Sequence, residues 1–210
     1  MKVTKYPQSC LIIEQEGKRI VIDPGALVSG KFSARELLPL DAILITHEHE
    51  DHADPELIRE LVGDSDTPVV ANQSTRNLLG DLVTQVVTDN EEFEVAGMKV
   101  VARELPHCLM VDGSAGPQNT GYVVDDVFFH AGDGIKLDNL QVQSAAIPIA
   151  GPDISARDVF NFIKQLHCLT VVPIHYDYFL ENPNLLAGIG ESTLQDVKFV
   201  VLDDGQSAEL

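Results

Sequence analysis

The apolar positions of this chain fall into short runs of strand length, separated by polar and turn-forming residues. Several runs are rich in Val and Ile, which favours buried strands over helices. The runs predicted as strands are residues 9–15, 19–23, 42–46, 68–71, 83–88, 93–95, 98–105, 122–124, 127–129, 145–149, 169–174 and 199–202. Three pairs of neighbouring runs are predicted to form β-hairpins, across short turns at residues 16–17, 96–97 and 125–126.

Three other segments carry helix start and stop signals. Asp54 followed by Pro55 is typical of an N-cap with proline at the first helical position, and that helix is expected to end at Gly63. A second helix is predicted over residues 73–79, and a third over residues 155–166, capped by its first residue. The order is hairpins, strands alternating with helices, hairpins again and a β-α-β unit. This order favours two mixed β-sheets packed on each other, with helices outside.

The length of 210 residues and the ordinary apolar fraction of 44% suit one globular domain spanning residues 1–210. No apolar stretch approaches the roughly 18 residues of a transmembrane helix. The first residues lack the apolar segment and cleavage site of a secretion signal. The 3 Cys are few and odd in number, which argues against a disulfide framework. We therefore expect a soluble cytoplasmic protein with reduced cysteines.

Acidic residues dominate the charge of the chain. Lys and Arg number 14, Asp and Glu number 33, and the formal charge is −19. Such a surface repels nucleic acid and anionic membranes at long range, and solubility explains most of it. Divalent cations bound locally would offset this charge, so a small anionic substrate stays compatible with it.

The densest group of metal-ligand side chains follows the strand predicted at residues 42–46. It combines three imidazoles and one carboxylate in an H-x-H-x-D-H pattern, formed by His47, His49, Asp51 and His52. Neutral imidazole is the commonest protein ligand for zinc-like ions, and carboxylate oxygens come next. Taken alone, the cluster could also be a solvated acidic turn. The intervening Glu48 and Glu50 are expected to be solvated or salt-bridged.

Three more ligand-type residues stand in matching contexts. His107, Asp133 and His175 come shortly after the apolar runs that end at residues 105, 129 and 174. Buried strands whose ends converge on one edge are where α/β sheets place their sites. Four loops that deliver nitrogen and oxygen donors to one edge favour a metal centre over a solvated turn.

At these residues the chain resembles the metallo-β-lactamase superfamily, over nearly its whole length. The resemblance rests on motifs in matching order and spacing: Asp23-Pro24, the H-x-H-x-D-H cluster, the lone His107, Gly132-Asp133 and Pro173-Ile174-His175. Within the superfamily, the chain is similar to ascorbate-6-phosphate-lactonase-like hydrolases and their small relatives. This similarity rests on its compact form and on the sequence motifs at residues 22–24, 130–133 and 173–176. The resemblance implies an α/β (α+β) fold, a four-layer α/β/β/α sandwich of two mixed β-sheets with helices on the outer faces.

The resemblance also implies two adjacent metal sites. The implied ligands are His47, His49 and His107 for the first ion, Asp51, His52 and His175 for the second, and Asp133 as the bridge. Seven ligands are too many for one tetrahedral ion and suit two ions that share a carboxylate and a water. Such a pair would ionise the bridging water to the hydroxide nucleophile, which Asp51 would help to orient as a catalytic residue. Donors without thiolate suit zinc, with manganese or iron as alternatives.

Several nearby polar residues fit two interpretations each. Asp23 suits either a hydrogen-bond partner behind a ligating imidazole or a turn residue before proline. His130 suits a hydrogen bond behind the site or packing at a strand end. Tyr176 and Tyr178 suit a proton donor or substrate contact, or ordinary loop aromatics. Where many small relatives carry a Gly-His pair, this chain has Gln8 in place of the His.

These observations predict a binuclear metal-dependent hydrolase that cleaves a small-molecule ester, lactone or phosphoester bond. Specificity would come from the loops at residues 112–118 and 176–190. A phosphodiesterase or nuclease could use the same site, but the charge and the lack of a basic patch argue against nucleic acid. A metal-binding or assembly domain without turnover is the third hypothesis, against which the complete ligand set weighs. Assembly into a homo-oligomer stays open.

Overall fold

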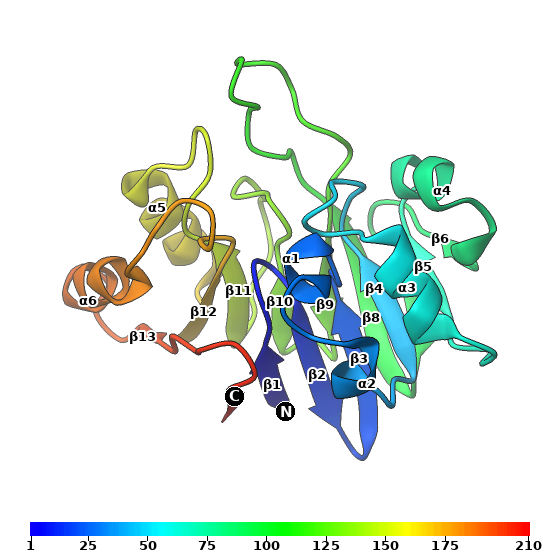
Figure 1. Cartoon of the computed structure of the whole chain (residues 1–210). Helices are drawn as coiled ribbons and strands as arrows, with labels where there is room; N and C mark the ends of the chain where they lie inside the picture. The colour runs from blue at the N-terminus through cyan, green and yellow to red at the C-terminus, as the bar shows by residue number, and fades with distance from the viewer.

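The computed structural model describes residues 1–210 and contains two mixed seven-stranded β-sheets (Figure 1). The first sheet has the order β14-β1-β2-β3-β4-β5-β6. Its strands are β1 (Lys2–Lys5), β2 (Leu11–Gln15), β3 (Lys18–Ile22), β4 (Ala42–Ile45), β5 (Val69–Ala71), β6 (Gln85–Val86) and β14 (Ser207–Glu209). The second sheet has the order β13-β12-β11-β10-β9-β8-β7. Its strands are β7 (Glu92–Val95), β8 (Met98–Glu104), β9 (Thr120–Val124), β10 (Phe128–His130), β11 (Ser144–Pro148), β12 (Thr170–Ile174) and β13 (Lys198–Phe199).

Helices cover the outer face of each sheet. Four helices and one 3-10 turn accompany the first sheet: α1 (Ala26–Ser29), α2 (Ala34–Leu37), α3 (Pro55–Val62), α4 (Gln73–Leu79) and η1 (Gly80–Leu82). Two helices accompany the second sheet: α5 (Ala156–Leu166) and α6 (Pro183–Thr193). Figure 1 shows the two sets on opposite sides of the paired sheets. The predicted four-layer α/β/β/α sandwich is confirmed.

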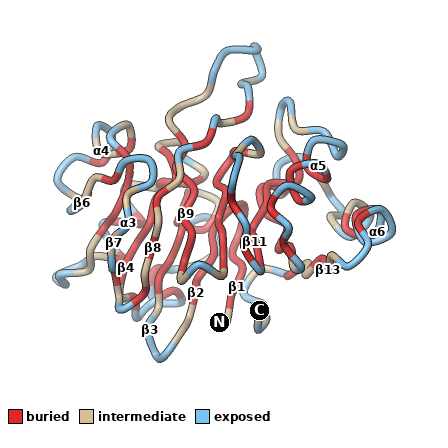
Figure 2. The backbone as a smooth tube through the Cα atoms, turned by 180° about the vertical axis from the view of Figure 1, so that it is seen from behind, coloured by how far each residue is buried: buried red, intermediate tan, exposed pale blue.

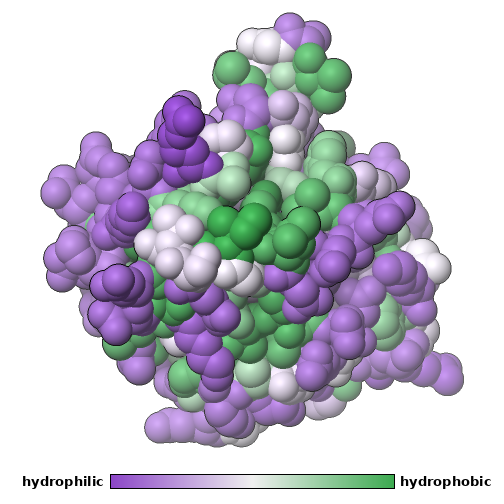
Figure 3. All heavy atoms as spheres, turned by 90° about the vertical axis from the view of Figure 1, so that its left-hand side faces the viewer, coloured by the Kyte–Doolittle hydropathy of each residue, from purple (hydrophilic) through white to green (hydrophobic).

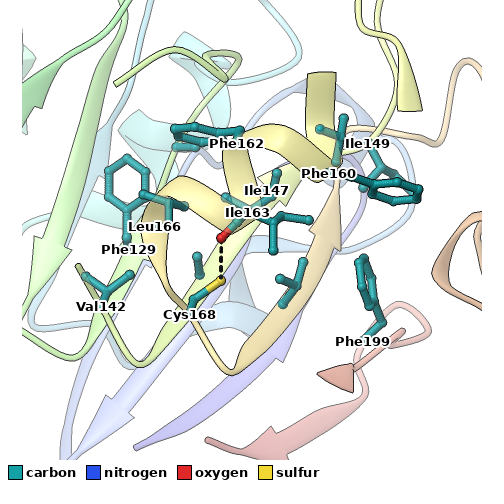
Figure 4. Close-up of a cluster of buried hydrophobic side chains, with 14 of the residues drawn as sticks. Phe129, Val142, Ile147, Ile149, Phe160, Phe162, Ile163, Leu166, Cys168 and Phe199 are labelled. Atoms are coloured by element: carbon teal, nitrogen blue, oxygen red, sulfur yellow. Dashed lines mark hydrogen bonds between the residues drawn. The ribbon is translucent and has the colours of Figure 1, made fainter. Parts of the chain in front are cut away.

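Three apolar clusters hold the four layers together. The central cluster draws residues from both sheets, such as Ile22 and Val172, and is therefore the core between them. The outer cluster of the second sheet contains Phe162 and Leu166 of α5, which lie over Phe129 in Figure 4. Figure 2 shows the same distribution, because buried positions follow the strands and exposed positions follow the connecting loops.

The local signals in the sequence explain why these elements form. The predicted hairpins are present, and positive φ angles occur at Glu16, Ala96 and Asp125, at the start of each turn. Asp54 caps α3, since its side chain accepts hydrogen bonds from the backbone of the first helical turn. Ser155 caps α5 in the same way.

The short helices α1 and α2, as well as elements near the chain ends, were not predicted from the pattern. The pairing of β1 with β14 joins the two termini, and neither strand shows a long apolar run. The segment at residues 176–190, expected to be a specificity loop, contains most of α6 instead. Its proline at the first helical position and its cap Asn182 are the start signals. Leu185 and Ile189 remain exposed on this helix, so its apolar positions do not mark a single buried face.

Strand direction brings the carboxyl ends of at least three strands of each sheet to one edge of the sandwich. In the first sheet, β1 and β3 both run antiparallel to β2, and β4 runs parallel to β3. In the second sheet, β8 and β10 both run antiparallel to β9, while β11 and β12 run parallel to β10. The loops after β1, β3, β4, β8, β10 and β12 therefore share an edge. The long loop after β8 rises from it at the top of Figure 1.

The molecular surface is mixed in character. Figure 3 shows the side that carries α5 and α6, where apolar side chains gather inside a polar surround. Leu185 and Ile189 are 69% and 49% exposed.

No helix of the fold combines the length and the apolarity that crossing a bilayer requires.

A buried lysine ties the start of the chain to its end. Lys5 is 1% exposed, and its Nζ lies 3.0 Å from Asp204 Oδ1 and 3.5 Å from Asp177 Oδ2. Burial by itself lowers the pKa of Lys5, but Tyr176 and these two carboxylates raise it above its ordinary value. Burial alone would raise the pKa of Asp204, but Lys5 and Lys31 lower it. The ion pairs thus hold the 203–206 turn against β1.

We expect the outer core to be more sensitive to truncation than the surface beside it. Leu166→Ala removes a fully buried side chain and should lower the free energy of unfolding by about 2–5 kcal/mol. The matched control Leu169→Ala, at a position 56% exposed, should change it by less than about 0.5 kcal/mol. Urea unfolding followed by circular dichroism measures both, and equal effects would contradict the assignment of the core.

Replacing Asp204 should change stability in a pH-dependent way. A carboxyl whose folded pKa is depressed contributes stability above its unfolded pKa of about 3.9, and this contribution is lost as pH falls through the folded pKa. Asp204→Asn should therefore cost about 1–3 kcal/mol at pH 7 and progressively less below about pH 4. The control Asp126→Asn breaks only an exposed pair with Lys99 and should have little effect at any pH. A pH-independent difference in urea unfolding would count against the ion pair.

Candidate metal centre

The H-x-H-x-D-H segment forms a tight loop at the carboxyl end of β4. The backbone N–H of His52 donates to the carbonyl of His49 at 2.9 Å, which closes the turn. Ala26 N–H donates to Glu50 O at 2.8 Å and holds the loop against the start of α1. The backbone of Asp51 lies so close to Gly25 that a Cβ there would collide with it. Glycine is therefore required at position 25 for the loop to dock.

The other predicted ligands reach the same place from the second sheet. His107 follows β8 and forms an isolated antiparallel bridge with Gly134. Asp133 follows β10, and its backbone N–H donates to Asn119 Oδ1 at 3.2 Å. His175 follows β12 in the left-handed region, with φ 58°. The ends of three strands thus place three distant residues around one point.

All seven predicted ligand residues come together in two groups. Within each group the candidate ligand atoms lie within 4.8 Å of one another. One group consists of His47, His49, His107 and Asp133, and the other of Asp51, His52 and His175. Most of these side chains are buried or half-buried, so bulk water has limited access to them.

Asp133 lies between the two groups and touches both. Its Oδ2 is 2.9 Å from Nε2 of His175 in one group and 3.3 Å from Nε2 of His107 in the other. Its Oδ1 is 3.1 Å from Nε2 of His52. A carboxylate that reaches both groups through two oxygens has the geometry of a bridging ligand.

Hydrogen-bond partners at Nδ1, on the side of the ring away from the other ligands, hold most of the imidazoles in place. Four of the five have a partner close to Nδ1: Asp23 Oδ2 for His52 (2.8 Å), Ala150 O for His175 (2.8 Å), Cys108 O for His107 (2.6 Å) and Thr46 Oγ1 for His47 (3.0 Å). Nδ1 of His49 instead faces Nε2 of His47 at 3.1 Å. Such partners fix the orientation of a ligating ring and leave Nε2 free to face a metal. The open question about Asp23 is resolved by this contact. It is both a residue of positive φ before proline and the partner of His52.

Unpartnered atoms at the centre test whether a cation fits. Nε2 of His52, Nε2 of His107 and Oδ1 of Asp133 are buried without a hydrogen-bond partner. The 3.1 Å approach of His52 to Asp133 is an ion-pair contact without hydrogen-bond geometry. Buried unpaired polar atoms are costly, and a cation among them would satisfy all three. The nitrogen and oxygen donors present therefore fit a zinc-like ion.

The electrostatics of the cluster also favour a cation. Burial alone would raise the pKa of Asp133, but His175 and His52 lower it well below its usual range. The pKa of Asp51 is lowered against burial by the same two imidazoles. Burial lowers the pKa of His107 and His175, yet Asp133 raises each to about 10. A negative potential that holds protons this strongly also attracts divalent cations, which displace protons on binding.

Other residues considered from the sequence take different places. His130 is buried and contacts Ser9 O at 2.8 Å through Nε2, outside both ligand groups. Tyr176 packs in the outer core and donates to a backbone carbonyl, so it is a structural aromatic. Tyr178 is 61% exposed, and its ring centroid lies 6.4 Å from that of Phe179, which in turn lies 5.9 Å from the ring of His175. Tyr178 is therefore the better candidate for a contact with substrate.

A cavity and the loop after His107 border the cluster on the side of this residue. A cavity of about 220 Å³ opens beside His107 and is also lined by Leu109, Ile135 and Lys136. The loop after His107 returns onto it, because a Cβ on Gly116 would collide with the imidazole. A larger hollow of about 400 Å³ lies under α5, at the opposite end of β12, and belongs to neither ligand group.

Sequence reasoning missed the polar residues that brace these loops. Asn72 donates through Nδ2 to Thr46 O at 2.9 Å, and Asn119 donates to Ala131 O at 3.0 Å. Both are fully or almost fully buried. The only signal was an Asn directly after or before an apolar run, which is equally typical of helix caps and turns. Gln8, where the sequence departs from the family pattern, reaches Asp51 through its side-chain amide.

Comparisons with known proteins agree with the fold. A family model described as a beta-lactamase superfamily domain matches residues 2–175. A UPF0173 metal-dependent hydrolase of Thermoplasma acidophilum is 26% identical over 193 residues, covering 85% of this chain and 84% of that protein. Among solved structures, the metallo hydrolase Igni18 of Ignicoccus hospitalis superposes with a TM-score of 0.76 at 21% identity, covering 99% and 97% of the two chains.

A further solved structure supports the fold alone. The metallo-beta-lactamase fold protein YhfI of Bacillus subtilis superposes with a TM-score of 0.73 at 13% identity, covering 99% of this chain and 98% of that chain. The expected likeness to lactonase-like hydrolases within the superfamily stays a prediction. Because the family model spans most of the chain and includes every predicted ligand, the chain belongs to the beta-lactamase superfamily.

Proposed function

We propose that this chain is a binuclear metal-dependent hydrolase that cleaves an ester, lactone or phosphoester bond of a small molecule. The observation that carries the proposal is the arrangement of Asp133. Its two oxygens contact imidazoles of both ligand groups, while buried Nε2 atoms around it lack partners. A site of this kind suits two cations that share one carboxylate.

The residues divide between the two ions by their grouping. The first ion would be held by His47, His49 and His107, the second by Asp51, His52 and His175, and both by Asp133. Zinc suits these donors, and manganese or iron are alternatives. When bound, such ions lower the pKa of a shared water and polarise the bond to be cleaved.

The protein's own contribution is a site prepared before substrate arrives. The imidazoles are oriented by fixed partners, so little reorganisation is needed at the moment of reaction. Asp51 is ionised at neutral pH, because the neighbouring imidazoles lower its pKa against the effect of burial. An ionised carboxylate in the second group can accept a hydrogen bond from the attacking water and align it.

The surroundings support a small substrate. The cavity beside His107 has a volume of about 220 Å³, smaller than the roughly 300–1,000 Å³ of most ligand pockets, so it suits only a small group. Lys136 lines it together with Asp153 and Asp158. With a net charge of −19, the protein disfavours the extended phosphate backbone of a nucleic acid, so a nuclease is the weaker alternative.

Removal of the bridging carboxylate tests the proposal directly. Asp133→Ala should bind fewer metal ions than the wild-type protein, for which about two ions per chain are expected. It should also lower the turnover of ester and phosphodiester probes. The loss should exceed the roughly 10–100-fold that is typical when the hydrogen-bond partner of a metal ligand is removed. Metal analysis of the purified protein and nitrophenol release measure these effects, and Asp138→Asn on the same loop is the exposed control. Wild-type protein that binds two ions but turns over no probe in a broad panel would favour the non-catalytic alternative.

Asp23 should affect metal affinity without being a ligand. Asp23→Asn weakens the acceptor behind His52 and should lower zinc affinity by about 10–100-fold, measured by competition with a chromophoric chelator. Asp125→Asn is the matched control. It also has positive φ and accepts hydrogen bonds from a backbone N–H and a glutamine, but lies at a hairpin turn. Unchanged zinc affinity in Asp23→Asn would contradict the role of Asp23 in orienting His52.

A further inference from the structure

Gln8 is a buried polar residue of the first sheet's loops that touches two members of the second ligand group, Asp51 and His175, without belonging to it. It lies in the loop between β1 and β2, is fully buried and has φ 63°. The loop is closed by the hydrogen bond from Tyr6 N–H to Cys10 O at 2.8 Å. Because β1 ends at the edge that carries the ligands, this loop delivers Gln8 into the cluster.

Gln8 contacts two members of the second group at once. Its side-chain Nε2 donates to Asp51 Oδ2 at 2.8 Å. Its backbone carbonyl accepts from the backbone N–H of His175 at 3.0 Å. Asp51 Oδ2 in turn lies 3.6 Å from His175 Nε2 and 3.8 Å from His52 Nε2. Gln8 thus contacts both Asp51 and His175, which are expected to bind the same ion, and helps to set the distance between them.

Gln8 is itself anchored from behind. Its backbone N–H donates to Asp177 Oδ2 at 2.8 Å, and the same oxygen pairs with the buried Lys5 at 3.5 Å. Lys5 is held further by Asp204 and by the ring of Tyr176, with Nζ 4.8 Å from the ring centroid. The contacts therefore run without a break from the buried lysine through Asp177 and Gln8 to Asp51.

The side chain of Gln8 is poorly explained by stability alone. Its Oε1 is buried without a hydrogen-bond partner, which costs free energy that an apolar side chain of similar shape would avoid. Its positive φ also disfavours most residues other than glycine. What the amide supplies in return is one donor, aimed at a carboxylate of the site.

We propose that Gln8 is a positioning residue that holds the Asp51 carboxylate in place for the second metal ion. The inference rests on the proposed binuclear function, because it assigns Gln8 to one of two ions. Gln8 takes no part as a ligand. Its Nε2 donates to Oδ2 of Asp51, the oxygen that faces His175 and His52, and so holds that oxygen beside the two imidazoles; the remaining lone pair of this oxygen can still coordinate an ion.

The test separates the affinities of the two ions. Zinc is titrated into the metal-free full-length protein in competition with a chromophoric chelator, and two stepwise constants are fitted. Gln8→Met removes the donor at nearly constant volume and should weaken the second constant by about 10–100-fold while leaving the first unchanged. Gln8→His should restore much of the loss, because its ring N–H is as many bonds from Cβ as the amide of glutamine. Histidine also tolerates positive φ better than most residues.

A matched control and a second variant keep the test decisive. Gln15→Met removes a glutamine that donates to Asp125 in a remote hairpin, and both of its zinc constants should equal those of wild type. If Gln8→Met does not fold, Asp177→Ala removes the acceptor behind Gln8 and should weaken the second constant in the same direction by a smaller factor. Circular dichroism of the metal-free variants reports folding separately.

The outcomes distinguish this inference from the function on which it rests. Wild-type protein that takes up fewer than two ions would overturn the binuclear proposal itself. If the wild-type protein shows two zinc constants and a folded Gln8→Met variant has the same two values, only the role of Gln8 is overturned. Equal weakening of both constants would also overturn it, because a general loosening of the site is not the positioning of one carboxylate.

Discussion

The structure at the candidate site depends on one interaction, the contact of the Asp133 carboxylate with imidazoles from both ligand groups. A buried carboxylate is costly unless positive charge or hydrogen bonds compensate for it. Here the compensation comes from rings that approach within 2.9–3.3 Å. The resulting potential raises the pKa of His107 and His175 to about 10 and suits the site to cations. The arrangement of every neighbouring loop can be understood as support for this contact.

The two-sheet architecture makes that support possible. Each sheet sends the carboxyl ends of three strands to the shared edge, so residues far apart in the chain meet over the central core. The core between the sheets is apolar and closely filled, which fixes the spacing between the His47–His52 loop and the loops of the second sheet. Behind the ligands lie fixed acceptors such as Asp23 and Ala150 O. Stability of the sandwich and geometry of the site therefore have a common origin.

Local sequence signals predicted most of the elements correctly because each depended on neighbouring residues. The turns at 16–17, 96–97 and 125–126 joined adjacent runs, and Asp54 and Ser155 capped helices that began beside them. The failures were of another kind. The pairing of β1 with β14 joins opposite ends of the chain, and α6 lacks a single buried apolar face. Neither feature leaves a periodic pattern in its own segment, so only packing against other elements reveals it.

For the site, the sequence by itself determined the donor types, their order and their placement at the ends of predicted strands. That sufficed to indicate metal chemistry, because few other functions need so many imidazoles near one carboxylate. Only the tertiary structure decided that Asp23 stands behind His52 and that Gln8 reaches Asp51. The physical reason is that these contacts join residues from different loops. Their distances are set by strand direction and by the thickness of the shared core, which no local pattern encodes.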